Sequence, residues 1–369
     1  MFFFIKILIL FNQHLKLKIT KKMTRSLITK INKKFISIIL ILLVASCSKS
    51  ENYNAELKGN TMGTYYIINL VEIPKSLKLE NIRSEIEKTL NLINSTLSNW
   101  DPNSEITKLN NNKKIGTIKI SNDLKEVLKQ ANIINVSSYG YFDITADPLI
   151  ELWGFGYKNK KTQTIPLQKE INDALLLVNQ KELFEINSTN NEFYKKNKDL
   201  KLNLSSIAKG YGIDQIGKKL ENLGLKNYLI NIGGDLLAKG YNKTKKNWMI
   251  GIENPNLNEK LVKEVINVSN KGVASSGDYK NFFIKNGKQF SHIINPNTGK
   301  PITHKTKSVT VVSSNTTNAD GWATALLAMG SEKGFKLAED YSMAVLFIDE
   351  VNKKLIKIKS SEFKKLIKE

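Results

Sequence analysis

The chain has 369 residues, of which 41% are hydrophobic and 24% are charged, with one cysteine and three histidines. This composition excludes intrinsic disorder, collagen-like repeats and coiled coil as the main content, and the single cysteine excludes a disulfide framework and a cysteine-rich zinc site. With so few histidines, a bound metal would be held by oxygen ligands, which favours Mg²⁺ or Ca²⁺. The formal net charge is +22, but no RNA-recognition or helix-turn-helix motif accompanies it, so we expect no nucleic-acid partner. An anionic membrane surface or an acidic partner fits the charge better.

Residues 1–46 are predicted to be an export signal. They contain nine Lys or Arg and no Asp or Glu, and an apolar run over residues 35–44 precedes small residues. Such a pattern is typical of a signal peptide, and the run is shorter than the roughly 20 residues that cross a bilayer. Residues 44–47, Val-Ala-Ser-Cys, resemble a bacterial lipobox, in which the cysteine becomes the lipid-carrying N-terminus. We expect residues 1–46 to be removed and Cys47 to anchor an extracytoplasmic chain, on the periplasmic side, to a membrane; an ordinary secretory signal is the alternative.

The mature chain, residues 47–369, shows no Pro-, Gly- or Ser-rich linker and no internal repeat, so we expect a single domain. The first predicted element is a strand over residues 64–70. Apolar residues at helical spacing then predict a helix over 79–98, and a Ser or Asn cap at 121–122 predicts a second helix that runs to about residue 136. A short helix is expected over 145–153, followed by a strand over 200–204 and a helix over 206–220.

The second half of the chain is richer in strands. Strands are predicted over 228–232, 236–240, 248–253, 261–268, 279–285, 308–313, 343–348 and 355–358. Two more helices are expected, over 318–329 and 361–367. Because strand runs mix with helices without a regular β-α-β repeat, the predicted fold class is α+β, with mixed, largely antiparallel sheets and packed helices.

The densest group of turns lies between residues 274 and 301 and surrounds His292. Loops of this kind present backbone amides and short polar side chains, which suit a phosphate or a pyrophosphate. His292 is expected inside a strand of apolar and small residues beside these loops. A lone histidine is more often structural than catalytic, and the neighbouring loops bring the two interpretations level.

Two further patterns suit a phosphate and its metal. Asp320 and Thr324 stand four residues apart at the expected start of a helix, so they share a face and offer hard oxygen donors for Mg²⁺. The residues alone favour the simpler interpretation, that Asp320 complements the helix N-terminus. Lys209 falls in the first turn of the helix over 206–220, a good phosphate position, although no glycine-rich loop precedes it; an ordinary Ser-capped helix is the alternative.

Aromatic residues mark two more turns. Trp100 belongs to a turn with a carboxylate and could stack on a flat ring, although aromatic residues at helix ends are more often core. Tyr141, Phe142 and Asp143 form the second turn of this kind.

Taken together, six ordered motifs resemble the ApbE family of flavin transferases across most of the mature chain. They are Thr-Met-Gly-Thr at 61–64, Leu-Ser-Asn-Trp at 97–100 with Ser-Glu at 104–105, Phe-Asp at 142–143 with Trp-Gly-Phe-Gly at 153–156, residues 205–210, residues 276–301 and residues 320–324. The resemblance implies an ApbE-like α+β fold and Mg²⁺-dependent cleavage of the substrate FAD. FMN would pass to a threonine hydroxyl of an acceptor flavoprotein, and AMP would leave.

The resemblance also implies roles for individual residues. His292 matches the essential histidine, expected to act as general base, and Asp320 and Thr324 match metal ligands, with a backbone oxygen at Ser206 and a further backbone oxygen at Ala323. The flavin nucleotide would contact Met62, Trp100, Tyr141, Phe142, Asp143, Asn203, Lys209 and Ile294. Departures from the family pattern are Asn203 for Asp, Trp100 for Tyr, Asn295 for Asp, Ile144 for Pro, and Ala323 where some members carry a carboxylate.

Two other functions are compatible with these residues. A hydrolase that splits FAD into FMN and AMP would use the same site with water as the acceptor. A flavin-binding lipoprotein without chemistry would need neither His292 nor the metal pair. By family analogy the acceptor would be a subunit of a membrane redox pump or another extracytoplasmic flavoprotein.

Overall fold

The computed structural model describes residues 52–156, 165–187, 189–253, 255, 262–279 and 281–367. Residues Asn52–Glu369 form one compact unit, while the predicted signal segment and Cys47 lie outside the described residues. Within the described part, no helix is both long enough and apolar enough to cross a membrane.

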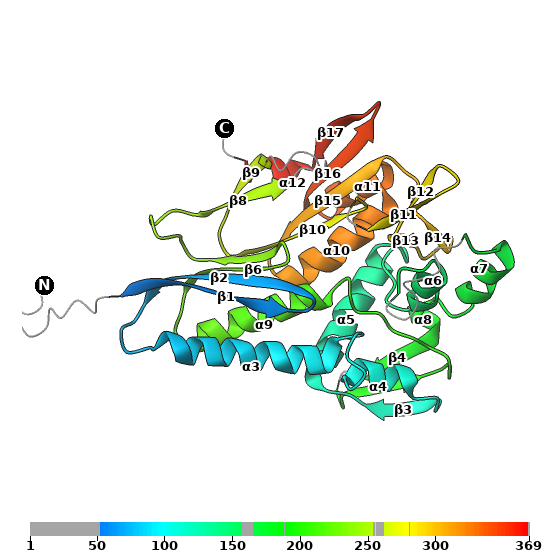
Figure 1. Ribbon diagram of the computed structural model, residues 1–369, viewed down its shortest axis with the longest axis horizontal. Coiled ribbons are helices and arrows are strands. Elements are labelled where there is room, and N and C mark those ends of the chain that lie inside the picture. Colours follow the sequence, from blue (N-terminus) through cyan, green and yellow to red (C-terminus); the bar gives the residue numbers. More distant parts are fainter. Residues whose placement is uncertain are drawn as a thin grey trace, which may run out of the picture. The chain divides into compact units, whose positions relative to one another are not determined.

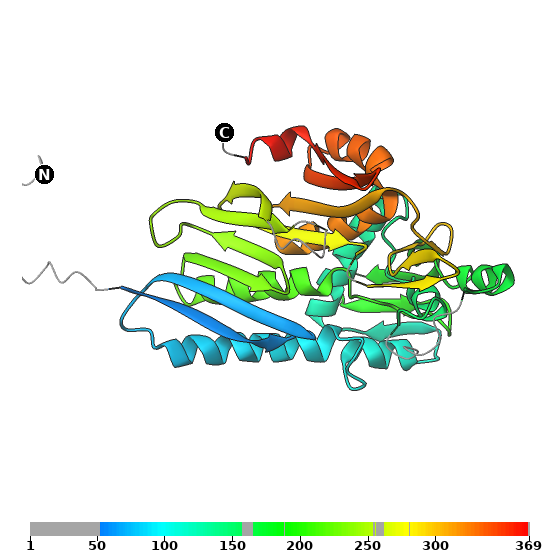
Figure 2. The same ribbon diagram turned by 45° about the horizontal axis from the view of Figure 1, so that its top comes forward.

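An eight-stranded sheet with the order β1-β2-β6-β7-β10-β15-β16-β17 forms the centre of the fold (Figure 1). Every neighbouring pair is antiparallel, which confirms the predicted α+β class. Figure 2 shows the strands in sequence colours from β1 in blue to β17 in red. Their bounds are β1 Tyr53–Thr61, β2 Thr64–Ile73, β6 Asn227–Ile232, β7 Asp235–Lys239, β10 Lys271–Gly277, β15 Thr306–Ser313, β16 Ala344–Val351 and β17 Lys354–Lys359.

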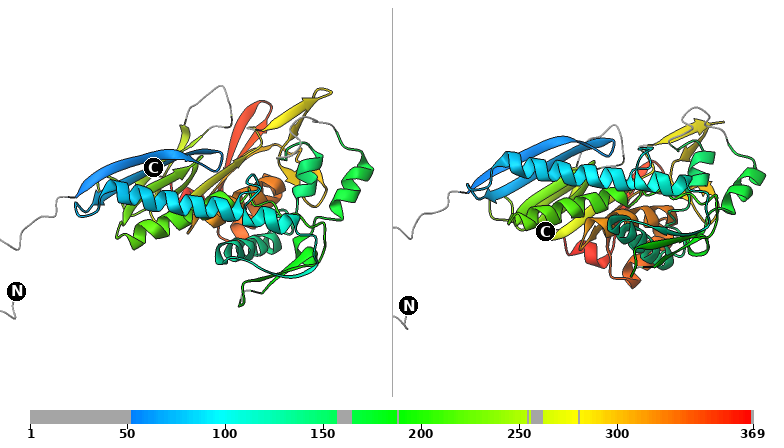
Figure 3. Two further views of the ribbon diagram at one scale, coloured as in Figure 1. Left: turned by 60° about the horizontal axis from the view of Figure 1, so that its bottom comes forward. Right: turned by 90° about the horizontal axis from the view of Figure 1, so that it is seen from below.

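Helices cover one face of this sheet. The predicted apolar stripe of α3 (Leu79–Leu97) is buried together with Ile213, Ile216 and Leu220 of α9 (Ala208–Asn222) against β1, β2 and β6. Figure 3 shows α3 and α9 side by side beneath the strands. Helices α5 (Asn122–Ser137), α10 (Thr316–Met329) and α11 (Ser331–Asp340) share a second core with β15 and β16. Because α10 is buried on nearly every side, side chains on it are placed firmly.

The opposite face is covered by a hairpin and a short helix. Trp248 and Ile250 of β8 (Trp248–Glu253) and Ile266 of β9 (Val262–Val268) pack on the sheet with Phe363 of α12 (Ser361–Lys364). The alternating burial along β8 shows why a sequence of this periodicity forms a strand with one covered side.

The remaining elements surround one end of the sheet. A three-stranded sheet has the order β3-β5-β4, and two small hairpins, β11–β12 and β13–β14, follow β10. The bounds are α4 Glu105–Asn111, β3 Gly116–Lys119, α6 Asp147–Leu152, α7 Gln168–Leu175, α8 Gln180–Leu183, β4 Phe184–Asn187, β5 Glu192–Lys195, β11 Phe282–Lys285, β12 Lys288–Ser291, β13 Ile294–Asn295 and β14 Lys300–Pro301.

Two stretches of the fold differ from the secondary structure expected from the sequence. Residues 200–204 form no strand, because the backbone of Leu202 bonds to the side chain of Asn110 instead of a neighbouring strand, with its N–H 2.7 Å from Oδ1. Residues 271–277, which the sequence placed largely among turns, form the central strand β10 between β7 and β15. Both differences arise from partners far away in the sequence.

Candidate functional site

A cavity of about 420 Å³ opens where several elements end. Its wall includes the turn after β6, the end of β10, the start of α9, the middle of α10 and the loop after β12. All described site predictions except Met62 and Ala323 line this one cavity: Trp100, Tyr141, Phe142, Asp143, Asn203, Ser206, Lys209, His292, Ile294, Asp320 and Thr324.

Met62 and Ala323 lie off the cavity wall. Met62 occupies the β1–β2 turn with φ of 50°, and its methyl group packs where a side chain on Gly212 would stand. Ala323, in the middle of α10, is fully buried in the core. The Met62 side chain is therefore not among the residues that line the cavity, while the metal contact expected from a backbone oxygen at Ala323 stays a prediction.

A buried cluster of one lysine and two carboxylates forms the floor of the site. Lys209 on α9 pairs with Asp235 at the start of β7, and the backbone N–H of Gly210 donates to Asp320 at 2.9 Å. Asp320 is only 5% exposed and Asp235 only 2%. Burial and the nearby charge of Asp235 raise the pKa of Asp320 well above its ordinary value, and Lys209 opposes this. Burial works to lower the pKa of Lys209, but the charges of Asp235 and Asp320 outweigh it and raise that pKa.

Gly210 makes this cluster possible. A Cβ at that position would lie 2.4 Å from the backbone oxygen of Thr316 and 2.9 Å from Cβ of Asp320. Only glycine therefore lets α9 approach α10 closely enough for Lys209 and Asp320 to share one charge cluster.

The structure excludes the helix-terminus interpretation of Asp320. Helix α10 begins at Thr316, two residues earlier than predicted, so Asp320 stands in its second turn rather than at its start. The side chain of Asn315 caps the helix, and Asp214 of α9 accepts the N–H groups of Thr316 and Thr317 at 2.8 Å each. The Ser-capped interpretation of α9 is also wrong, because its N-cap residue, Ile207, makes no side-chain cap bond.

The donor set around Asp320 fits a magnesium ion that is completed by substrate oxygens. Thr324 Oγ1 lies 3.2 Å from Ser276 Oγ, so hydroxyls stand beside the buried carboxylate. A cation would offset the charge that burial makes costly on Asp320. Among the described residues no group of three or more His, Cys, Asp or Glu could hold a metal alone. Mg²⁺ commonly binds one or two carboxylates together with water and substrate phosphate.

His292 lies on the cavity wall in a bend between β12 and β13, not inside a strand as predicted. Its Nδ1 lies 2.8 Å from the carbonyl oxygen of Asn281. A carbonyl only accepts, so Nδ1 carries the proton and Nε2 of the neutral ring is the basic nitrogen. Burial lowers the pKa of His292, and the bond to Asn281 opposes this. The neutral ring suits a group that takes up a proton.

The opposite wall is built from braced polar residues. Asp143 accepts the N–H groups of Thr145 and Gln180 at 2.8 and 3.1 Å, so its carboxylate fixes two loops. Asn203 donates to Asp147 at 2.9 Å. Trp100 is 63% exposed and stands on the wall, so it is no core residue.

Asp235 is the functional residue that the sequence did not single out. Its signal was a carboxylate directly after two glycines, which we interpreted only as a turn between strands. The turn carries Gly233 onto the cavity wall and Asp235 beneath Lys209. Asn281 is a second such residue, since its backbone oxygen orients His292.

The fold and the cavity together define an α+β protein with a polar cavity, lined by Lys209, His292 and Asp320, between a central antiparallel sheet and its helices. Residues 62–347 match the model of the ApbE family. A relative named FAD:protein FMN transferase from Haemophilus influenzae is 37% identical over 335 residues, which cover 90% of this chain and 96% of the relative. One of the same name from Vibrio cholerae is 33% identical, with coverage of 89% and 97%.

Solved structures agree with the sequence matches. The flavin transferase ApbE from Vibrio cholerae superposes with a TM-score of 0.78 at 32% identity, covering 86% of this chain and all of the other. The apo flavinyl transferase ApbE from Pseudomonas stutzeri superposes with a TM-score of 0.79 at 29% identity, covering 86% and 97%. This chain belongs to the ApbE family.

Proposed function

We propose that this chain is a transferase that moves FMN from FAD to a threonine hydroxyl of an acceptor flavoprotein, with Mg²⁺ bound and AMP released. The names of its relatives support the coarser activity, FAD:protein FMN transfer. The observation that carries the proposal is the cavity itself, whose lining joins a neutral histidine, a partly buried lysine and a set of hard-oxygen donors.

His292 is the group that takes the acceptor proton. The threonine Oγ attacks the phosphorus of the FMN half, the bond from that phosphorus to the bridging oxygen breaks, and AMP leaves with the bonding electrons. Nε2 of His292 accepts the hydroxyl proton, so atoms and charge balance. Asn281 holds the ring in the tautomer that this step requires.

Lys209 and Asp320 act on the phosphates. Lys209 is held charged by Asp235 and Asp320, so it presents a fixed cation to the pyrophosphate. Asp320, Thr324 and a backbone oxygen at Ser206 would hold Mg²⁺, which supplies charge neutralisation on the phosphoryl oxygens. The aromatic wall of Tyr141 and Trp100 would receive the flavin ring.

The transferase and the hydrolase differ only in the acceptor. The test incubates the purified chain with FAD, Mg²⁺ and a candidate acceptor flavoprotein, and then measures the acceptor by mass spectrometry. A mass gain of one FMN group supports transfer. Free FMN without an adduct identifies a hydrolase, and neither product identifies a binding protein. An acceptor with its target threonine changed to valine is the control.

We also propose that the chain is an extracytoplasmic lipoprotein anchored through Cys47 on the periplasmic side, where its acceptor is a subunit of a membrane redox pump. The lipobox-like Val-Ala-Ser-Cys at 44–47 supports this. Cys47→Ala is expected to release soluble protein or to leave an uncleaved precursor. Unchanged size and unchanged membrane fractionation would contradict the anchor.

A further inference from the structure

A group of exposed lysines gathers at the end of the sheet where β1 begins. They lie in the loops that join β2 to α3, α9 to β6 and β7 to β8, and at the first residue of β10, and we call them the basic end: Lys75, Lys78, Lys226, Lys243, Lys245, Lys246 and Lys271. The connecting segments 74–78, 223–226, 240–247 and 269–270 contain no Asp or Glu. This end therefore carries a strong positive charge.

Hydrogen bonds show that these loops lie together. The N–H of Glu72 donates to the side chain of Asn54 near the start of β1, at 3.0 Å, while the Glu72 carboxylate pairs with Lys245. The side chain of Asn270 accepts from the N–H of Gly240 at 3.3 Å. In Figures 1 and 2 the β7–β8 loop and the start of β1 lie at the same side of the sheet.

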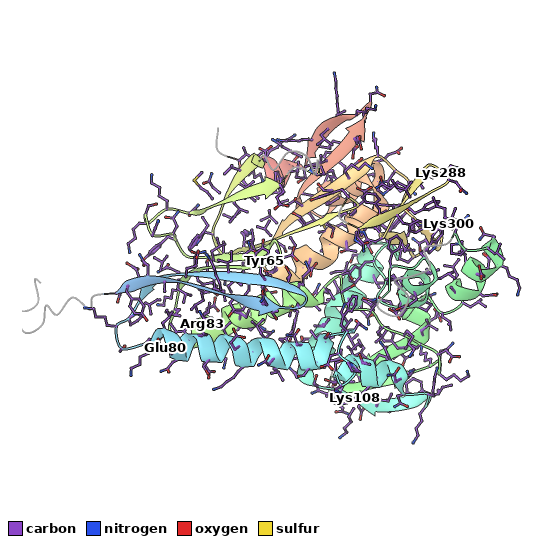
Figure 4. The ribbon with its side chains drawn as sticks, viewed as in Figure 1. Tyr65, Glu80, Arg83, Lys108, Lys288 and Lys300 are labelled. Atoms are coloured by element: carbon purple, nitrogen blue, oxygen red, sulfur yellow. The ribbon has the colours of Figure 1, made fainter. Side chains whose placement is uncertain are left out.

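The acidic residues nearest to the basic end offset only part of its charge. Glu72 pairs with one of the seven lysines, Lys245, and accepts the hydroxyl of Tyr241, while Glu221 pairs at 3.0 Å with Lys239, which is outside the group. Glu80, in the first turn of α3, is a further carboxylate near these loops (Figure 4). Exposed like charge of this density attracts an anionic surface.

The cavity opens at the other end of the same strands. Strand β6 runs from Asn227 at the basic end to Ile232, and the next residue, Gly233, lines the cavity. Six residues of strand span about 20 Å. A flat surface that contacts the basic end would therefore leave the cavity open to a protein acceptor.

The length of chain before the first described residue points to a lipid bilayer as that surface. Asn52 is five residues after Cys47, and five residues reach at most about 18 Å. A lipid on Cys47 would keep the start of β1, and the lysines around it, within that reach of the membrane. One lipid signal combined with a basic patch is a common way to hold a protein stably on a membrane.

We propose that the basic end binds anionic phospholipid headgroups and orients the anchored chain with its flavin cavity directed away from the bilayer. The proposal rests on the lipid anchor proposed above. Anionic headgroups would contact the ammonium groups of the four loops, an attraction that decays within about 10 Å at 0.1 M salt.

The test measures which end of the full chain lies at the membrane. The protein purified from membranes is placed on phosphatidylcholine vesicles with or without phosphatidylglycerol, which contain a nitroxide-labelled headgroup lipid. A fluorophore is attached through Thr244→Cys in the β7–β8 loop or, as a matched control, through Thr298→Cys in the exposed β13–β14 turn. Lipid occupies the sulfur of Cys47, so the introduced cysteine is the reactive one.

We expect strong quenching at position 244 and weak quenching at 298. Because the lipid anchor alone keeps the start of β1 near the bilayer, this difference should become smaller, rather than vanish, without phosphatidylglycerol or at 1 M salt, where the screening length is about 3 Å. The variant Lys226→Gln/Lys243→Gln/Lys246→Gln should weaken quenching at 244. Each lost lysine should lower the equilibrium preference for the orientation with the basic end on the membrane by roughly fivefold. The control Lys108→Gln/Lys288→Gln/Lys300→Gln, whose sites lie away from the start of β1 in Figure 4, should change nothing.

On vesicles that carry the protein, equal quenching at both positions, or a difference that is the same with and without phosphatidylglycerol, would overturn headgroup binding by the basic end and leave the anchor standing. A chain that does not float with vesicles would overturn both the proposed lipid anchor on Cys47 and the proposed binding of headgroups by the basic end. FMN transfer to a soluble acceptor in detergent is measured for every variant and should stay at the level of the unchanged chain, which separates this proposal from the transferase activity.

Discussion

Two regions of this protein each combine a buried aspartate with a histidine, and their surroundings differ. In the cavity, Asp320 receives one backbone N–H and lies beside a second carboxylate. Behind the C-terminal end of α10, Asp349 is 1% exposed and accepts the hydroxyls of Thr306 at 2.8 Å and Ser331 at 2.7 Å. The Asp320 carboxylate therefore accepts one hydrogen bond from a neutral donor, whereas the Asp349 carboxylate accepts two.

The histidines differ in the same sense. His292 lines the cavity, and its Nδ1 is hydrogen-bonded to the carbonyl oxygen of Asn281, whereas Nε2 takes no part in that bond. His304 packs against Gly330, and within the described part neither of its ring nitrogens has a hydrogen-bond partner. The candidate active site therefore combines two neighbouring carboxylates, Asp320 and Asp235, with an oriented base, as perturbed groups at functional sites often do. The structural cluster instead combines a hydrogen-bonded carboxylate, Asp349, with a packed histidine ring.

The largest expected effect belongs to His292. His292→Ala should slow FMN transfer by about 10²–10⁴-fold, the usual value of general-base help, with little change in FAD affinity. Single-turnover rates of folded, FAD-saturated variant and wild type measure this. A loss of less than about fivefold, well under that range, would remove His292 from the mechanism.

The pH dependence of the same step follows from the direction of the pKa shift. The base works when neutral, so the rate falls as the pH drops through its pKa. Burial lowers that pKa, so the acid limb should have its midpoint below about 6.5. A midpoint clearly above that value in the single-turnover profile would contradict the buried, neutral ring.

Asp320→Ala tests the cavity carboxylate. Loss of the proposed ligand should lower transfer by about 10²–10³-fold, whereas the free energy of unfolding should hold or rise because the repulsion with Asp235 disappears. Rates over a Mg²⁺ titration and denaturant unfolding give both quantities. Full activity at limiting Mg²⁺ would show that Asp320 is not a ligand.

Asp349→Ala should give the reverse result. It leaves the hydroxyls of Thr306 and Ser331 without their acceptor, so unfolding free energy should fall by about 1–3 kcal/mol. Transfer by the folded fraction should stay within about twofold, because surface and core changes away from the site act through stability. If activity falls while stability holds, the division between the two regions is wrong.

The smallest effect is expected for His304→Leu. Replacing an unpartnered buried ring by an apolar side chain should change stability by less than about 1 kcal/mol at pH 7. Burial lowers the pKa of His304 below its unfolded value, so protonation favours the unfolded chain and stability is lost as the pH falls below about 6.5. In denaturant unfolding, the variant should lose less free energy of unfolding between pH 7 and pH 5 than the unchanged chain. Some loss should remain, because His292 also has a lowered pKa. An unchanged acid dependence would contradict this.

Much of the fold was determined by the sequence through short-range signals. The stripe of α3 and the Ser121 cap of α5 predict those helices because spacing and caps act within a few residues. The ordered motifs likewise placed Lys209, His292 and Asp320 in one site. These residues stand in local patterns that a linear sequence displays.

Tertiary structure alone decided the rest. Strand β10 exists because β7 and β15 pair with it, and residues 200–204 avoid a sheet because Asn99 and Asn110 bond their backbone. Asp320 is not needed to satisfy the N-terminus of α10, because Asp214 of α9 accepts the N–H of Thr316 there. Asp235 became part of the site only when a two-glycine turn brought it under Lys209. In each case the deciding partner is distant in sequence, and no local pattern records such a hydrogen bond or ion pair.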